Sequence, residues 1–242
     1  MKSKSEVGHA KNGANLNDLI SFVESYGADY NPTKTGLTLP ALVALASNAQ
    51  TDLTNVINQG VAYNNAVHDR SEAFDTLPGF ATRVMNSLKA TDASPELIKD
   101  TQGFNRKLQG GRAKPKPPVD PNATPLASNS TRQQSFDQKV QHFEALIAVA
   151  ASEDSYVPGE DDLKIAGMNA RLAHYVAKKN DVDTAFTALS NARVSRNKTL
   201  YKTSVGLVDV AKAVKNYVKS VYGAQSPEFA QVRPIHFKVI LR

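Results

Sequence analysis

A stretch that occurs twice decides the fold of this chain: residues 30–42 read YNPTKTGLTLPAL, and residues 156–168 read YVPGEDDLKIAGM. A constant offset of 126 pairs Tyr30 with Tyr156, and it also pairs the proline two residues later and three apolar residues that follow. Self-similarity at a fixed offset predicts that the chain contains two copies of one structural repeat.

The same register extends beyond this stretch. The offset of 126 pairs Val56 with Val182, and a Ser-Pro-Glu motif at residues 94–96 returns at residues 226–228 with an offset of 132. The predicted organisation is a flexible N-terminal tail, a first helical repeat, a Pro/Gly-rich basic linker and a second helical repeat, at residues 1–13, 14–108, 109–130 and 131–242.

Each repeat contains one long apolar seam. In the first repeat the seam runs in alternating steps of three and four from Leu39 to Leu77, and the second repeat has the same spacing from Ile165 to Leu200. Such spacing is typical of a helix with one buried face. The first seam predicts a helix roughly 55 Å long at a rise of 1.5 Å per residue.

Local chemistry indicates where the helices begin and end. Thr38 and Thr76 each stand two residues before a proline, so each hydroxyl is predicted to cap a helix with proline in its first turn. The first long helix should therefore end before Pro78, and the second should end around residues 202–206. The serine of each Ser-Pro-Glu motif is predicted to cap one further short helix.

These elements predict an all-α protein, an elongated up-and-down helical bundle built from two tandem pseudo-symmetric repeats. One long helix flanked by two short ones leaves much of its stripe uncovered, so we expect the long helices to pack together and the repeats to form one domain. Two independent three-helix domains remain the alternative. Residues 235–242 alternate only partly, and could form a short strand, extend along the bundle or lie exposed.

Composition limits the class of protein. Of the 242 residues, 41% are hydrophobic, which is enough for a core, and none is cysteine, which excludes disulfides and thiolate metal sites. The apolar runs are far shorter than the ~20 residues that cross a bilayer, and the polar N-terminal residues do not resemble a signal peptide. We therefore expect a cytoplasmic protein without membrane contacts.

Two arginines occupy equivalent seam positions. Arg70 and Arg196 are paired by the offset of 126, and each follows an asparagine, Asn65 or Asn191, by five residues. We predict a polar network of these four residues near the middle of the bundle. In it, the guanidinium groups either bond to helix-end carbonyls and carboxylates or bind an anion. The alternative, which we favour, is structural: each arginine stem packs in the seam, and its head is satisfied locally or by solvent.

The net charge of +6 suggests a second kind of partner. Basic residues gather in the second repeat and the linker, where a polyanion such as nucleic acid could bind, although no helix-turn-helix signature or RNP aromatic pair is present. The candidate contact residues are Arg106, Lys107, Arg112, Lys114, Lys116, Lys178, Lys179, Arg193 and Lys198.

No motif in the sequence indicates catalysis or cofactor binding. The chain has no Walker A loop, no GxGxxG and no GxSxG, and its five histidines form no HExxH pair. The acidic residues between 153 and 162 lack EF-hand spacing and suit the start of the following helix. We predict that the protein is not an enzyme and has no cofactor and no metal.

The motifs together resemble a known group of proteins. Tyr-x-Pro, the Leu-x-Leu/Ile start of the long helix, Asn-Ala-(x)3-Arg in its second half and Ser-Pro-Glu near the end are similar to duplicated helical proteins of uncharacterised function from bacteria. The resemblance covers residues 16–237. It implies the fold and a bacterial origin, and it carries over no active site.

The leading hypothesis is a non-catalytic helical scaffold or protein-interaction protein that binds another protein or itself. Polyanion binding through the basic residues is the alternative, and a bundle that binds a small ligand near Arg70 and Arg196 is the third. The two tyrosine–proline loops are predicted to be structural, with each ring covering the end of the bundle.

Overall fold

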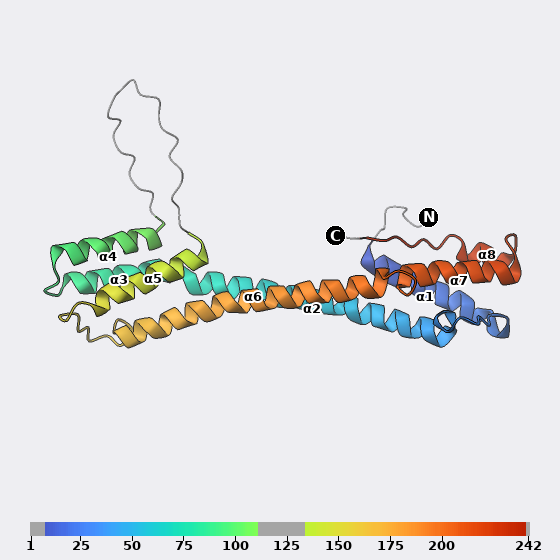
Figure 1. Cartoon of the computed structure of the whole chain (residues 1–242), viewed down its shortest axis with the longest axis horizontal. Helices are drawn as coiled ribbons and strands as arrows, with labels where there is room; N and C mark the ends of the chain where they lie inside the picture. Colours follow the sequence, from blue (N-terminus) through green and yellow to red (C-terminus); the bar gives the residue numbers. More distant parts are fainter. Residues whose placement is uncertain (1–7, 111–133, 241–242) are drawn as a thin grey trace, which may run out of the picture. The chain divides into compact units, whose positions relative to one another are not determined.

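The computed structural model describes residues 8–110 and 134–240, and within them the chain is all-helical and has no strand (Figure 1). This confirms the predicted all-α class. The helices are α1 (His9–Ser25), α2 (Leu39–Asp75), α3 (Leu77–Lys89), α4 (Pro95–Leu108), α5 (Phe136–Ala151), α6 (Ile165–Tyr201), α7 (Leu207–Tyr222) and α8 (Pro227–Val232), with short 3₁₀ turns at Gly27–Asp29 and Thr35–Leu37.

The two long helices are found where the seams predict them. α2 and α6 each contain 37 residues. α2 ends just before Pro78, and α6 ends at a turn in which Gly206 approaches the preceding backbone closely. A Cβ at Gly206 would lie 2.5 Å from the amide nitrogen of Lys202, so this turn requires glycine.

The predicted helix caps are correct for Ser94 and Ser226 and wrong for Thr76. Ser94 accepts a hydrogen bond from the amide of Leu97 at 3.2 Å, and Ser226 accepts one from the amide of Phe229 at 3.1 Å. Thr76 makes no cap bond, because its hydroxyl donates to the carbonyl of Ala73 in the preceding helix at 3.2 Å. The hydroxyl of Thr38 likewise donates backwards, to the carbonyl of Thr35.

The described chain forms two compact units. Unit 1 comprises residues 8–63 and 185–240, and unit 2 comprises residues 64–110 and 134–184. The boundary between the units falls within both long helices, so α2 and α6 each have one part in unit 1 and the other part in unit 2. Neither unit coincides with a predicted repeat, because each takes residues from both.

In unit 1, α1 and α7 pack against the start of α2 and the end of α6. The buried side chains of this core include Leu16 and Leu19 of α1 and Val214 and Val218 of α7. Tyr30, in the loop before α2, is buried beside them and donates its hydroxyl to the carbonyl of Leu37 at 2.7 Å. This bond closes the loop that leads into α2.

In unit 2, α3 and α5 cover the end of α2 and the start of α6, and α4 packs against α3 and α5 (Figure 1). An aromatic group at the centre joins Phe74, Phe143 and Tyr175, with ring centroids 4.7 and 5.7 Å apart. Tyr156, in the loop before α6, donates its hydroxyl to the carbonyl of Leu163 at 2.9 Å. The two tyrosine–proline loops therefore make the same bond over the same seven residues.

Positions that the predicted repeat register pairs are buried in both units. The offset is 127 between α1 and α5, 126 in the loops and long helices, and 130 between α3 and α7. The pairs in which both residues are buried include Leu16 and Phe143, Leu19 and Leu146, Ile20 and Ile147, Tyr30 and Tyr156, Leu37 and Leu163, Leu42 and Met168, Leu77 and Leu207, Val84 and Val214, and Leu88 and Val218.

The structure corrects the predicted bounds of the N-terminal tail and describes little of the predicted linker. α1 begins at His9, so residues 9–13 are helical and the tail predicted for residues 1–13 is too long. Asn12 and Gly13 are weak helix formers, which hid this turn in the sequence. Most of the predicted linker lies outside the described residues. Residues 233–234 form a turn after α8, and residues 235–240 then run extended along unit 1 without forming a strand.

The loop tyrosines allow a matched test of these bonds. Burial raises the pKa of Tyr30 to about 12, so its hydroxyl remains a donor near neutral pH. Tyr30→Phe removes the donor and leaves the buried carbonyl of Leu37 unpaired, and we expect a loss of about 1–2 kcal/mol in the free energy of unfolding. Urea titrations measure this loss. Tyr156→Phe should cost a similar amount, and a neutral result for both would show that the loops do not depend on these bonds.

Candidate functional site

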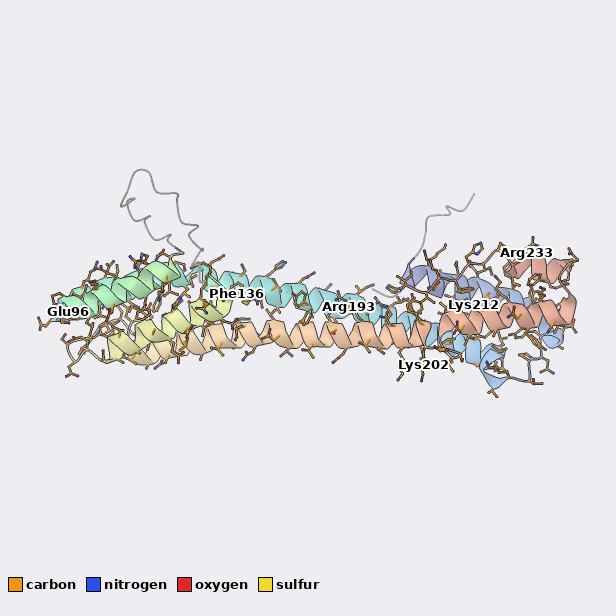
Figure 2. The ribbon with its side chains drawn as sticks, turned by 45° about the horizontal axis from the view of Figure 1, so that its top comes forward. Glu96, Phe136, Arg193, Lys202, Lys212 and Arg233 are labelled. Carbon is orange, nitrogen blue, oxygen red and sulfur yellow. The ribbon has the colours of Figure 1, made fainter. Side chains whose placement is uncertain are left out.

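The two seam arginines lie in different units. Arg70, on the part of α2 in unit 2, places its guanidinium 4.0 Å from the ring centroid of Phe136. Phe136, labelled in Figure 2, is the first residue of α5. The Nε atom of Arg70 is buried and has no hydrogen-bond partner among the described residues. Stacking on a ring satisfies the planar face of a guanidinium, so Arg70 holds the start of α5 against α2.

Arg196, on the part of α6 in unit 1, has a different environment. Only 8% of its surface is exposed, and its Nε and Nη2 donate to Oδ1 of the adjacent Asn197 at 3.1 and 2.8 Å. Burial lowers the pKa of this guanidinium, because the charged form loses solvation.

The predicted asparagine partners do not join these arginines. Asn65 and Asn191 are both exposed. Arg196 bonds to Asn197 and not to Asn191, and Arg70 stacks on Phe136. The structure therefore gives each arginine its own surroundings in place of a shared four-residue network. A spacing of five residues along a helix does not bring two side chains to one face, which is the physical reason.

The basic candidates divide into paired and exposed residues. Lys178 lies 3.2 Å from Asp69, and Lys179 lies 2.6 Å from Asp137. The hydrogen bond to Asp137 raises the pKa of Lys179. These ammonium groups already have carboxylate partners, so they offer little to a polyanion.

Arg193 and Lys198 are exposed on α6, where Figure 2 shows Arg193 and, just beyond the helix end, Lys202. Arg106 and Lys107 are exposed in the last turn of α4, where positive charge suits the helix dipole. Arg112, Lys114 and Lys116 lie outside the described residues.

The most unusual surface was not predicted from the sequence. α2 carries no charged residue in the sixteen positions from 53 to 68, although 21% of the chain is charged. α6 likewise carries none at residues 184–192. A count of charged residues along the two long helices identifies this surface, whereas the spacing of apolar residues does not.

Within unit 1 this charge-free segment of α2 is paired with α6. Asp52 accepts hydrogen bonds from Ser195 at 3.0 Å and from Thr199 at 2.5 Å, and the rings of Tyr63 and Phe186 lie 5.8 Å apart. As α2 advances from residue 52 to 63, its contacts move back along α6 from residue 199 to 186. The two helices are therefore antiparallel here.

The paired segments of α2 and α6 are exposed to solvent on the side that faces away from their mutual contact. None of the residues from 53 to 63 is buried. Ile57 and Val61 of α2 expose 65% and 55% of their surfaces, and Phe186 of α6 exposes 54%. We call residues 53–63 of α2 and 185–192 of α6 the neutral face. It offers apolar and amide side chains without any charge.

Metal and membrane chemistry find no support in the residues that the structure describes. In the ranges 8–110 and 134–240, no three His, Asp or Glu side chains are grouped closely enough to hold a metal ion. Over the same ranges, none of the helices combines the length and the apolar content needed to span a bilayer.

One buried histidine is a separate feature of unit 2. His142 of α5 is 5% exposed, and its Nε2 has no hydrogen-bond partner among the described residues. Burial, helped by the positive charge of Lys107, lowers the pKa of His142 below its ordinary value of 6.5. Burial therefore favours the neutral form of this imidazole in the folded chain.

The protein matches no protein-family model, and searches of the curated proteins and of the solved structures found no match either.

His142 predicts a dependence of stability on pH. In the unfolded chain this histidine binds a proton near pH 6.5, whereas the folded chain resists protonation until a lower pH. The unfolded state then binds more protons, so stability should fall as the pH drops below about 6.5. His142→Gln should make this decline shallower in urea titrations at pH 7, 6 and 5. His174→Gln, at an exposed position of α6, is the control. An unchanged slope in the His142 variant would contradict the assignment.

Proposed function

We propose that this chain is a non-catalytic helical interaction protein whose neutral face binds the same face of a second copy. The observation that carries the proposal is the charge-free segment of α2 and α6 in unit 1, together with its exposed apolar side chains. Three points support the proposal: the face carries no charge, a face without charge can pack against its own copy without repulsion, and the sequence predicts a duplication.

Absence of charge distinguishes this face from an ordinary solvated surface. Exposed helices usually carry charges that keep them soluble, and single exposed apolar residues are common. Here Ile57 and Val61 are one turn apart on α2, and Phe186 lies across on α6. Burying such a face removes apolar surface from water and leaves no charge unpaired.

A second copy is the partner that this chemistry fits. A two-fold axis brings one patch against itself, so the patch must be compatible with its own charge distribution. A face without charge meets this condition because it creates no like-charge contacts. Two antiparallel helices from each copy then make a four-helix arrangement, in which the amides of Asn55, Asn58 and Gln59 can bond to one another or to water.

The predicted duplication supports the same proposal. The two tyrosine bonds, the two serine caps and the paired buried positions at offsets of 126, 127 and 130 are the features expected of two repeats. On this view each repeat gives its first helix to one unit and its last helices to the other. Membership in the group of duplicated bacterial proteins is part of the same proposal.

Self-association can be tested with one charge on the neutral face. Ile57→Lys places an ammonium group where a partner would bury it, so the dimer should no longer form. Sedimentation equilibrium at micromolar concentrations measures the mass. Val43→Lys is the matched control, because Val43 is a similarly exposed residue of α2 outside the neutral face. A monomeric wild-type chain, or equal effects of the two substitutions, would overturn the proposal.

Polyanion binding is a second candidate because of how charge is distributed in unit 1. Residues 193–240 contain nine Lys or Arg and only two acidic residues. Arg193, Lys198 and Lys202 are exposed near the end of α6. These side chains form no ion pair with a carboxylate in the described chain, unlike Lys178 and Lys179.

A salt titration tests this candidate. Duplex DNA binding, followed by fluorescence anisotropy, should weaken steeply with salt because each neutralised phosphate releases counterions. Changing Arg193, Lys198 and Lys202 to Ala should weaken binding and reduce the slope by about one for each phosphate that the variant no longer neutralises. Changing Lys178 and Lys179 to Ala should have little effect. Absence of binding at low salt, or a flat dependence, excludes the candidate.

A further inference from the structure

The segment of residues 233–240, a turn at 233–234 followed by an extended stretch at 235–240, is bound to α1 and α7 mainly through its backbone. Asn12 of α1 is 3% exposed, and its side-chain amide pairs with residue 238 in both directions. Nδ2 of Asn12 donates to the carbonyl of Lys238 at 2.7 Å, and the amide of Lys238 donates to Oδ1 of Asn12 at 3.1 Å. A carboxamide that meets both groups of one residue recognises the main chain whatever its side chain is.

Two further side chains bind the same segment. One turn along α1, Asn15 donates to the carbonyl of His236 at 2.6 Å. From α7, the ammonium group of Lys215 donates to the carbonyls of Arg233 and Ile235, both at 2.9 Å. Burial lowers the pKa of Lys215, so these carbonyls replace part of its lost solvation. Side chains of α1 and α7 thus form hydrogen bonds with four carbonyl groups and one amide group of the segment's main chain.

The side chains of the segment alternate as those of an extended chain do. Ile235 and Phe237 pack against the core of unit 1, while His236 and Lys238 are exposed. The two apolar side chains therefore fix the register of the segment on unit 1, and the main-chain hydrogen bonds fix the direction in which the segment runs. These are the two elements of recognition used when a protein binds an extended peptide.

We infer that α1 and α7 form a binding groove for an extended segment, and that residues 233–240 of a second copy can occupy it in exchange for the chain's own segment. The occupant is argued from the contacts themselves, because a second copy carries the sequence already seen to fit. Exchange also leaves α1 and α7 intact, since their bonds to the segment come from side chains and not from their backbones.

The chain's own segment competes for the groove with the segment of a second copy, and it is favoured because its covalent attachment gives it a high effective concentration. Exchange between wild-type copies is therefore expected at high protein concentration, when transient release of the segment exposes the groove. The inference is independent of the neutral face, which uses α2 and α6.

Complementation between two variants tests the inference in the full chain. Asn12→Ala damages the groove but keeps the segment. Lys238→Pro damages the segment, because proline has no amide hydrogen, but keeps the groove. A mixture should form a mixed dimer, since the intact segment of one chain meets the intact groove of the other. Neither variant alone should do so.

The controls separate this result from the neutral face and from misfolding. All chains carry Ile57→Lys, so contact through the neutral face does not contribute. Co-purification through a tag on one chain measures the mixed dimer, and circular dichroism checks the helix content of each variant. If the mixture gives no more co-purification than a chain carrying both Asn12→Ala and Lys238→Pro, exchange is overturned.

A peptide measurement decides the matter if Asn12→Ala proves unstable. A fluorescent peptide of residues 233–240 should bind the Lys238→Pro chain more tightly than the wild-type chain, whose groove is filled. The same peptide with proline at position 238 should bind about tenfold more weakly or worse, because it cannot donate to Asn12. Equal anisotropy for the two peptides would contradict the groove.

Discussion

An apolar seam that runs through a helix of 37 residues needs neighbours to cover it, and the rest of this structure depends on that constraint. In unit 1, α1 and α7 cover the start of α2 and the end of α6. In unit 2, α3 and α5 cover the other parts. Residues 53–63 of α2 receive α6 as their neighbour within unit 1 and are not buried. The neutral face thus lies on the stretch of the long helices in unit 1 that the short helices do not cover.

Local sequence signals predicted the helices well because helix formation and capping depend on nearby residues. The heptad spacing predicted both long helices, and the serines of the Ser-Pro-Glu motifs cap α4 and α8. Thr76 failed as a cap because a hydroxyl near a helix end can also donate to a carbonyl three residues back. Sequence alone does not decide between these two bonds, since both cost little and use the same side chain.

Long-range arrangements were harder to predict for a physical reason. A repeat register shows which positions are equivalent, but not which copy supplies the neighbour. Leu16 and Leu77 belong to one predicted repeat and are buried in different units. The arginines show the same limit. Arg70 and Arg196 are equivalent in sequence, yet one stacks on Phe136 and the other bonds to Asn197, because a long side chain finds the nearest partner available.

The extended segment of unit 1 follows from one proline. α4 continues for fourteen residues, whereas α8 ends after six at Val232, and Pro234 cannot continue a helix. The carbonyls released at that point need donors, because buried backbone groups are rarely left unpaired. Lys215 and Asn15 supply donors, and Asn12 supplies both a donor and an acceptor. The buried Asn12 of α1, which looks like a poor choice for a packed helix, is explained by the backbone that it binds.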